Sequence, residues 1–220
     1  MKTFHELQEG VYDPNIFKAF FLAGGPGSGK SYVARKTTGG TGLKSVNSDE
    51  AFELLLKRAG LSLKMPPEET EPRDVVRGKA KRITAGMKAN YLEGRLGLII
   101  DGTGRDVDKI LAQKAGLEEL GYDTYMIFVN TSLDVALKRN ADRPRRVAEP
   151  IVVKSWKDVQ ANIGKFSNMF RAGFIVIDNN NAGEDVFSDV WKRVKGLLRK
   201  KVQNTRALNW MAAELARKKR

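Results

Sequence analysis

The feature that most constrains this 220-residue chain is a glycine-rich segment placed between an apolar run and a helix-forming stretch. Residues 24–31 read Gly-Gly-Pro-Gly-Ser-Gly-Lys-Ser and follow Lys-Ala-Phe-Phe-Leu-Ala at 18–23. The segment fits the pattern G-x-x-x-x-G-K-[ST] at every fixed position. A buried strand, a tight loop and the start of a helix in this order predict the phosphate-binding loop of a nucleotide-binding α/β domain.

Each part of this loop has a physical task. The glycines allow the backbone to turn sharply and direct N–H groups at phosphate oxygens, and the helix that begins at Lys30 adds the positive end of its dipole. Lys30 is predicted to reach the β- and γ-phosphates of ATP, and the Ser31 hydroxyl to join the shell of a Mg²⁺ ion. The predicted contacts to the nucleotide are Gly25, Gly27, Ser28, Gly29, Lys30, Ser31, Tyr32 and Arg139.

The rest of the chain alternates short apolar runs with helical stretches, which is the pattern of a parallel sheet with crossover helices. Strands are predicted at 18–23, 43–47, 96–100, 124–129 and 174–177. Helices are predicted at 30–38, 49–59, 72–92, 106–120 and 131–141, from about 151, around 187–197 and near 208–215. The pattern predicts an α/β fold with a doubly wound, five-stranded parallel sheet. Residues 1–200 are expected to form this domain, and 201–220 a basic C-terminal helical extension.

Two acidic residues follow predicted strands and are expected at the carboxyl edge of the sheet, where open α/β sheets bind ligands. Asp101 comes directly after Leu-Gly-Leu-Ile-Ile and is predicted to hold Mg²⁺ directly or through water. Asp49 follows the second strand and is the best candidate for a base that accepts the proton of an acceptor hydroxyl. The simpler interpretations are a strand-ending Asp-Gly turn at Asp101 and a helix N-cap at Ser48 or Asp49.

An arginine-rich segment follows the fourth strand and its helix. Arg139 ends the helix, and Arg143, Arg145 and Arg146 lie in the predicted lid loop at 142–150. Guanidinium groups on a mobile lid would close on a triphosphate and neutralise charge in the transition state. Arg143 and Arg145 are therefore predicted to be catalytic together with Lys30 and Asp49. An exposed basic turn is the alternative interpretation.

Together these segments resemble the small P-loop kinases, in particular the zeta-toxin-like proteins and the phage polynucleotide 5′-hydroxyl kinases. The resemblance rests on the loop at 24–31, Asn-Ser-Asp at 47–49, Ile-Ile-Asp-Gly-Thr-Gly at 99–104 and the arginine-rich lid, and covers residues 16–180. It implies a three-layer P-loop NTPase sandwich with helices on both faces and strand order 2-3-1-4-5. It also implies ATP and Mg²⁺ as cofactors, Asp49 as the acceptor-activating base, and Arg143 or Arg145 on the triphosphate. Such chains are often phage-encoded, and we expect that origin here.

The resemblance leaves the acceptor open, because these families phosphorylate nucleic-acid hydroxyls, nucleosides and UDP-sugars. The acceptor is expected between Asp49 and the helices at 49–59 and 72–92. A basic face on the second helix would suit a phosphate-bearing acceptor, whereas a solvated helix surface is the simpler interpretation. The predicted substrate contacts are Asp49, Arg77, Arg82, Thr103 and Arg105.

The net charge of +13 is concentrated at the end of the chain, because residues 192–220 hold eleven Lys or Arg and one acidic residue, Glu214. A basic tail attracts phosphate backbones independently of sequence. This favours a nucleic-acid acceptor, either a DNA or RNA 5′-hydroxyl or a hydroxymethylated base in DNA. The alternatives are a small acceptor, such as a UDP-sugar, nucleoside or nucleotide, and a non-catalytic ATP-binding module. The intact set of Lys30, Ser31, Asp49 and Asp101 argues against the last alternative.

The composition excludes several classes of protein. The chain has no Cys, which excludes disulfides and thiolate chemistry, and its single His, His5, makes a histidine-based metal site or catalytic triad implausible. No apolar run approaches the roughly 20 residues of a membrane helix. The first thirty residues lack a basic start followed by an apolar stretch, so no secretory signal is expected. We therefore expect a cytoplasmic location, in the host cytoplasm if the chain is phage-encoded, and no membrane partner.

Overall fold

The computed structural model describes residues 10–218, so His5 and the last two basic residues of the tail, Lys219 and Arg220, lie outside the described residues. The strands are β1 (Lys18–Ala23), β2 (Lys44–Val46), β3 (Leu98–Asp101), β4 (Asp123–Asn130) and β5 (Phe174–Asp178). The helices are α2 (Lys30–Thr38), α3 (Ser48–Arg58), α4 (Thr70–Glu93), α5 (Val107–Glu119), α6 (Leu133–Ala141), α7 (Glu149–Phe170), α8 (Glu184–Leu198) and α9 (Thr205–Lys218). Short 3-10 turns are η1 (Gly10–Tyr12), η2 (Pro67–Glu69) and η3 (Arg171–Gly173).

The five strands form one parallel sheet in the order β2-β3-β1-β4-β5, which confirms the order that the resemblance implied. The central strand β1 pairs with β3 on one side and β4 on the other, and all of its residues are buried. This burial explains the continuous apolar run at 18–23. Lys18 is also buried, and its amine forms an ion pair with Asp123 at the start of β4.

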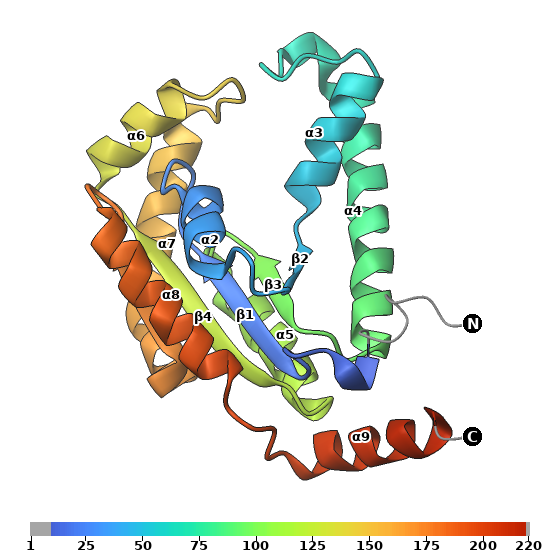
Figure 1. The fold of residues 1–220 in the computed structure, drawn as a ribbon. Helices are drawn as coiled ribbons and strands as arrows, with labels where there is room; N and C mark the ends of the chain where they lie inside the picture. The colour runs from blue at the N-terminus through green and yellow to red at the C-terminus, as the bar shows by residue number, and fades with distance from the viewer. Residues whose placement is uncertain (1–9, 219–220) are drawn as a thin grey trace.

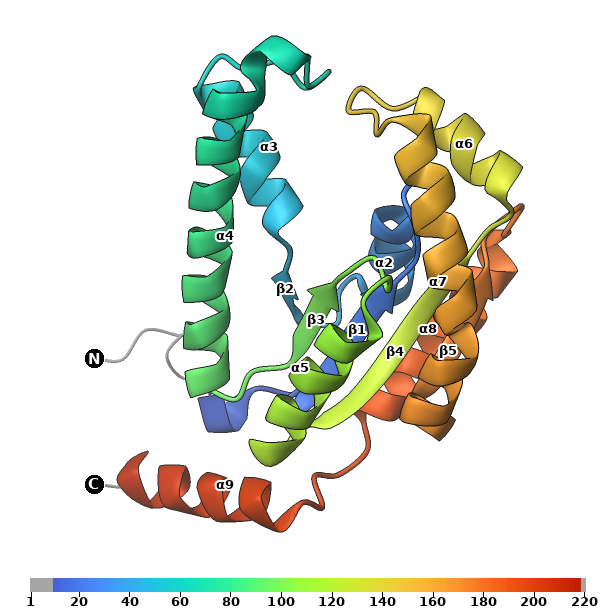
Figure 2. The same cartoon turned by 180° about the vertical axis from the view of Figure 1, so that it is seen from behind.

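Helices cover both faces of the sheet and produce the expected three-layer sandwich (Figures 1 and 2). On one face, under α2 and α8, Phe20, Ile127 and Phe187 belong to one core cluster. On the other face, under α5 and α7, Phe21 and Phe166 belong to a second cluster. The alternation of inward positions along β1 thus supplies both cores.

Helices α3 and α4 stand beside the sheet and pack on each other (Figure 1). They share a small core of their own, made of Phe52, Leu56, Val76 and Ala80. Val76 and Ala80 are the only residues that α4 buries, so most of its 24 residues remain exposed or half-exposed. The pair therefore flanks the carboxyl edge of the sheet as an arm with a largely open outer helix.

Helix α9 lies at the opposite end of the sheet, where the strands begin (Figures 1 and 2). Trp210 packs edge-to-face on Phe17, the residue before β1, with ring centroids 5.6 Å apart. Arg206 donates a hydrogen bond of 2.9 Å to the carbonyl of Glu119 at the end of α5. Residues Thr205–Lys218 of the basic extension thus form a helix that is docked on the amino ends of the strands.

Several element boundaries differ from the predicted ones. The third strand begins at Leu98 instead of Leu96, because the chain turns at Arg95, which has a φ of 55°. Helix α7 begins at Glu149, two residues earlier than expected, because Pro150 fits the first turn of a helix. Within residues 10–218 no helix combines the length and apolarity that crossing a membrane requires.

Candidate active site

The phosphate loop leaves the carboxyl end of β1 and turns tightly into α2. Gly24, Gly27 and Gly29 have positive φ values of 150°, 77° and 83°. A Cβ atom at Gly27 would lie 2.0 Å from the carbonyl oxygen of Ala136 on α6. At Gly24 it would lie 2.7 Å from the carbonyl oxygen of Val129. Glycine is therefore required both for the backbone conformation and for the close approach of α6 and β4.

Lys30 begins α2, and its Nζ donates a hydrogen bond of 2.8 Å to the carbonyl of Gly24. The amine therefore lies over the loop from which it projects. Burial lowers the pKa of Lys30, and the charges of Asp101 and Asp49, which raise it, do not fully offset this effect. A partly dehydrated ammonium group in this position is suited to contact an anion that replaces the lost water.

The loop forms one wall of a cleft of about 670 Å³ between α2, α3 and the lid loop at 142–148. Segments that are far apart in the chain meet here, as expected at the carboxyl edge of a doubly wound sheet. The lid loop and the α3–α4 connector approach each other across the cleft mouth, and Met65 and Val147 line it from the two sides (Figures 1 and 2). The predicted site residues that line the cleft are Gly25, Gly27, Gly29, Lys30, Ser31, Tyr32, Asp49, Arg77, Asp101, Thr103, Arg139, Arg143 and Arg145.

Asp49 is held by two arginines from different parts of the chain. Nη1 of Arg77, on α4, donates to Oδ1 at 2.7 Å, and Nη2 of Arg145, in the lid loop, lies 3.2 Å from Oδ2. Burial acts to raise the pKa of Asp49, but the hydrogen bonds and charges of Arg145 and Arg77 outweigh it and lower the pKa to about 2. Nε of Arg145 also lies 3.3 Å from Oε1 of Glu53, one turn further along α3. Ion pairs therefore join α3 to the lid loop across the cleft.

Asn47 is the N-cap of α3, since its side chain accepts a hydrogen bond of 2.8 Å from the backbone N–H of Asp49. The interpretation of Ser48 or Asp49 as the cap is therefore wrong. Because Asn47 accepts a hydrogen bond from a free N–H group at the start of α3, the carboxylate of Asp49 is not needed as a cap and contacts the two arginines in the cleft.

Asp101 is the last residue of β3, and its side chain fits a cation ligand. Among the described residues its buried Oδ1 has no hydrogen-bond partner. Burial raises the pKa of Asp101, and the charge of Lys30, which lowers it, is partly cancelled by that of Asp49. Residues 10–218 contain no group of three His, Cys, Asp or Glu side chains that would hold a metal by themselves. Mg²⁺ in nucleotide sites needs only one or two protein ligands beside phosphate and water, so Ser31 and Asp101 fit this ion.

Thr103 reaches the cleft because the loop after β3 is tied down on two sides. Its carbonyl accepts a hydrogen bond of 3.0 Å from the N–H of Gly24. On the other side Asn162, from α7, donates to the carbonyls of Gly104 and Arg105 at 3.1 and 2.8 Å. The loop after β3 is thereby fixed against the start of the phosphate loop.

Three predicted site residues do not line the cleft. Ser28 is 1% exposed, and its hydroxyl has no hydrogen-bond partner among the described residues. Arg82 is exposed on α4. Arg105 lines an adjoining cavity of about 220 Å³, which shares Asp101 and Thr103 with the cleft. The substrate contacts predicted for Arg82 and Arg105 therefore lie outside the cleft itself.

The predicted site residues did not include Glu53 and Asn179, and of these two only Glu53 carried a signal in the sequence. Glu53 follows Asp49 by four residues on the same helix and therefore shares its face. Asn179 directly follows β5, at the same edge of the sheet as Asp101. The rule that selected Asp101 would have selected Asp178 instead, because the predicted strand ended at residue 177 and β5 includes Asp178.

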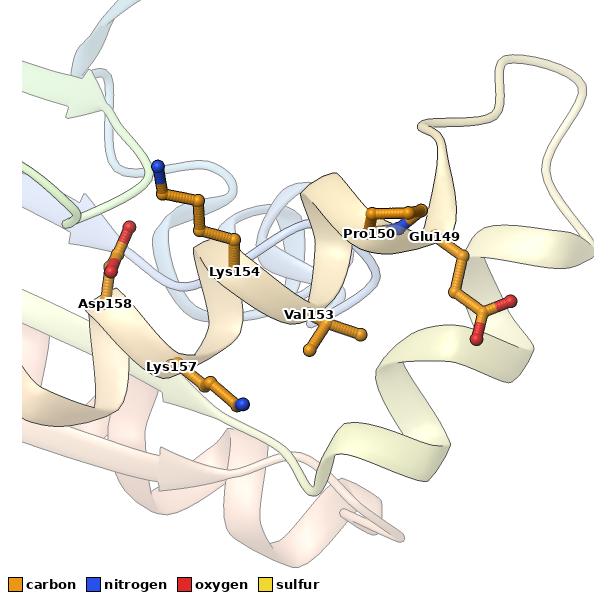
Figure 3. A pocket seen from close by; sticks show the side chains of 6 residues that line it. All are labelled: Glu149, Pro150, Val153, Lys154, Lys157 and Asp158. Carbon is orange, nitrogen blue, oxygen red and sulfur yellow. The ribbon is translucent and has the colours of Figure 1, made fainter.

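Another hollow, of about 640 Å³, lies on the surface of α7 (Figure 3). Lys154 and Asp158 project to one side of the helix, and Val153 and Lys157 to the other. The lining residues all come from the amino-terminal half of α7, and none is a predicted site residue. The convergence of segments at the cleft makes the cleft the stronger candidate.

Comparison with solved structures supports the fold. Shikimate kinase from Acinetobacter baumannii, solved with shikimate, is similar over 88% of this chain and 99% of its own, with 15% identity and a TM-score of 0.50. The AvrRxo1-ORF1:-ORF2 structure with ATP is similar over 72% of this chain and 53% of its own, with 16% identity and a TM-score of 0.56. A chain of the Pnkp1/Rnl/Hen1 RNA repair complex is similar over 69% of this chain and 47% of its own, with 22% identity and a TM-score of 0.52. This chain thus spans about half the length of the last two chains.

Comparison of the sequence gives the family. No curated protein matches the chain. Residues 8–189 match the family model described as Zeta toxin, which covers the phosphate loop, both acidic strand ends and the lid. The fold and this match show a P-loop kinase, which is a phosphotransferase. The chain therefore belongs to the zeta toxin family.

Proposed function

We propose that the protein transfers the γ-phosphate of ATP to a hydroxyl group of a nucleic acid, either a DNA or RNA 5′-hydroxyl or a hydroxymethylated base in DNA. The observation that carries this proposal is the meeting of Lys30, Asp101 and Asp49 in one cleft. A cation for phosphate, a carboxylate for metal and a carboxylate for the acceptor proton are the groups that such a transfer needs.

The donor is bound by the phosphate loop. The N–H groups of the loop and Nζ of Lys30 bind the β- and γ-phosphates, while Tyr32 and Arg139 flank the nucleotide. Ser31 and Asp101 would hold Mg²⁺, which would neutralise phosphate charge. Arg143 and Arg145 approach from the lid and stabilise the charge on the transferred group.

Asp49 accepts the proton of the acceptor hydroxyl while the oxygen of that hydroxyl forms a bond to the γ-phosphorus. The bond from that phosphorus to the β–γ bridging oxygen breaks, and ADP leaves. A carboxylate with a pKa of about 2 is a weak base at neutral pH. When phosphate oxygens draw Arg145 away from Asp49, the pKa of Asp49 rises, because one of its two cationic partners has gone. Binding of ATP would thereby activate the base.

Helix α4 supports a nucleic acid as the acceptor. It carries six basic and three acidic residues and reaches the base through Arg77. Lys79, Lys81 and Arg82 are exposed and form no ion pair with any described residue. An unpaired basic surface on the helix that contacts Asp49 through Arg77 suits a chain of phosphates, which such side chains bind without reading sequence.

The basic tail lies too far from the cleft to support the same acceptor. Helix α9 lies at the amino ends of the strands, and the six residues of β1 separate the two ends of the sheet by roughly 20 Å at 3.3 Å per residue. A tail at that distance would touch only a distant part of a long substrate. The proposal of a nucleic-acid acceptor therefore rests on the basic residues of α4 and not on the basic tail.

The cavity beside the cleft favours the alternative, a small acceptor such as a UDP-sugar, nucleoside or nucleotide. It measures about 220 Å³, opens next to Asp101 and Thr103, and contains Arg105 and Lys109 as cations for a phosphate group. Such an acceptor would bind without help from the exposed charges of α4.

A triple substitution separates the two acceptors. We expect Lys79→Ala/Lys81→Ala/Arg82→Ala to raise KM for a DNA or RNA acceptor and to leave KM for ATP unchanged. The slope of log affinity against log salt should fall by about one for each phosphate that the variant no longer binds. The matched control is Arg199→Ala/Lys200→Ala/Lys201→Ala, which also removes three exposed charges, at the opposite end of the sheet.

Equal effects of the two variants would show that α4 is not a specific surface for nucleic acid. Unchanged turnover of a UDP-sugar or nucleoside by the triple variant, with no turnover of nucleic acid by the wild type, would establish the alternative.

A further inference from the structure

Asn179 contacts both the phosphate loop and α6, and it has no role in the proposed phosphate transfer. It is 5% exposed and directly follows β5. Its backbone N–H donates a hydrogen bond of 2.8 Å to the carbonyl of Asn130, the last residue of β4. The backbone of Asn179 is therefore anchored to the sheet before its side chain makes any contact.

The side chain of Asn179 contacts the back of the phosphate loop. Its Nδ2 donates a hydrogen bond of 2.7 Å to the carbonyl of Ser28. A Cβ atom at Gly29 would lie 2.5 Å from the same nitrogen, so Asn179 packs directly against the Ser28–Gly29 peptide. The contact joins residues 151 positions apart in the chain.

The direction of this hydrogen bond matters for phosphate binding. In a trans peptide the C=O and N–H groups point in opposite directions. Because Asn179 holds the Ser28 carbonyl on the outer side of the loop, the N–H of Gly29 points to the inner side. Gly29 is the N-cap of α2, where the first N–H groups have no intrahelical acceptor and are available to an anion.

The same residue connects the loop with the lid. Nη1 of Arg139, on α6, donates to the carbonyl of Asn179 at 2.7 Å, and Nη2 donates to the carbonyl of Asn180 at 3.0 Å. Helix α6 ends at Ala141, directly before the lid loop. Asn179 thus holds the phosphate loop with its side chain and the base of the lid with its carbonyl.

We propose that Asn179 is a positioning residue that fixes the Ser28–Gly29 peptide, aims the Gly29 N–H at the triphosphate and ties the phosphate loop to the base of the lid. This inference rests on the proposed binding of ATP by the loop. It adds a residue outside the glycine-rich motif whose loss weakens binding of the phosphates and leaves recognition of the nucleoside part intact.

The test compares Asn179→Ala and Asn179→Asp with Asn181→Ala, the control, because Asn181 is exposed two residues further along the same loop. Dissociation constants are measured for MgATP and for inorganic tripolyphosphate with Mg²⁺. We expect Asn179→Ala to weaken both by the same factor, about tenfold, since one buried hydrogen bond is removed and the loop loses its support. The control should bind both ligands like the wild type.

Asn179→Asp separates the hydrogen bond from simple packing. The side chain keeps its size but turns a carboxylate oxygen toward the Ser28 carbonyl, so we expect a loss at least as large as with alanine. Full affinity in the aspartate variant would show that only the shape matters and would overturn the proposal. Weakened MgATP with unchanged tripolyphosphate would mean that Asn179 contacts the nucleoside, which would also overturn it.

Folding and function are checked separately. Thermal unfolding shows whether each variant is folded, and Asn179→Ser is used if alanine prevents folding. Wild-type protein that binds neither ligand would refute the proposed function. Wild-type protein that binds both, with both Asn179 variants unchanged, would refute this inference alone.

Discussion

Replacing Asp49 by Asn should remove the charge that joins α3, α4 and the lid loop, and its effect on stability can be worked from the structure. The pKa of Asp49 falls from 3.8 to about 2. At 1.36 kcal/mol per unit this shift corresponds to about 2.4 kcal/mol. The side chain of Asp49 is 44% exposed, so solvent screening reduces the expected loss to about 1 kcal/mol at neutral pH.

The sign of the pH dependence follows from the lowered pKa. The contribution of Asp49 is fully present above its unfolded pKa of about 4 and is lost as the pH falls toward about 2. Urea unfolding of the wild type and Asp49→Asn, from neutral pH into this range, measures the difference directly. The control is Glu50→Gln, because Glu50 is exposed and forms no ion pair with any described residue.

Two results would refute this reasoning. Equal stability of Asp49→Asn and the wild type at neutral pH would mean that the pairs with Arg77 and Arg145 contribute nothing in solution. A difference that persists unchanged down to about pH 2 would mean that it does not come from the charge of Asp49.

Three further predictions concern the loop and the tail. Lys30→Ala should abolish turnover of ATP without lowering the melting temperature, and normal turnover would contradict the assigned role of the loop. Gly27→Ala should lower the affinity for MgATP by at least tenfold in calorimetric titration, because a Cβ there would lie 2.0 Å from the carbonyl oxygen of Ala136. Gly86→Ala is the control and should bind normally, because a Cβ at Gly86 would meet no atom outside the adjacent backbone of its own helix within 4 Å. Trp210→Ala should destabilise the protein by up to about 3 kcal/mol in urea unfolding and leave KM for the acceptor unchanged; a raised KM would place α9 at the substrate.

The fold could be predicted from the sequence because its signals are local. The apolar run at 18–23 and the glycines after it define the central strand and the loop, and a parallel sheet brings Asp49 and Asp101 to one edge. The position of these carboxylates at this edge follows from the parallel direction of the strands, whereas the strand order was implied by the resemblance to the small P-loop kinases. No further contact had to be known in advance.

The contacts between side chains could not be predicted in the same way. Arg145 and Asp49 are 96 residues apart, and no periodicity specifies which arginine of the lid meets which carboxylate of α3. The same holds for Asn179 and Ser28, since a hydrogen bond across the sheet edge depends on loop conformations. The charge of the tail was evident from the sequence, but its packing through Trp210 on Phe17, at the amino ends of the strands, was not.

The most direct test of the central claim is transfer of label from γ-labelled ATP in the presence of Mg²⁺. The acceptors are DNA and RNA with free 5′-hydroxyls, hydroxymethylated DNA, nucleosides and UDP-sugars. We predict that the wild type labels a nucleic acid and that Asp49→Asn binds ATP but transfers no label. Label confined to a UDP-sugar or nucleoside would contradict the nucleic-acid acceptor, and label released only as inorganic phosphate would contradict a hydroxyl acceptor altogether.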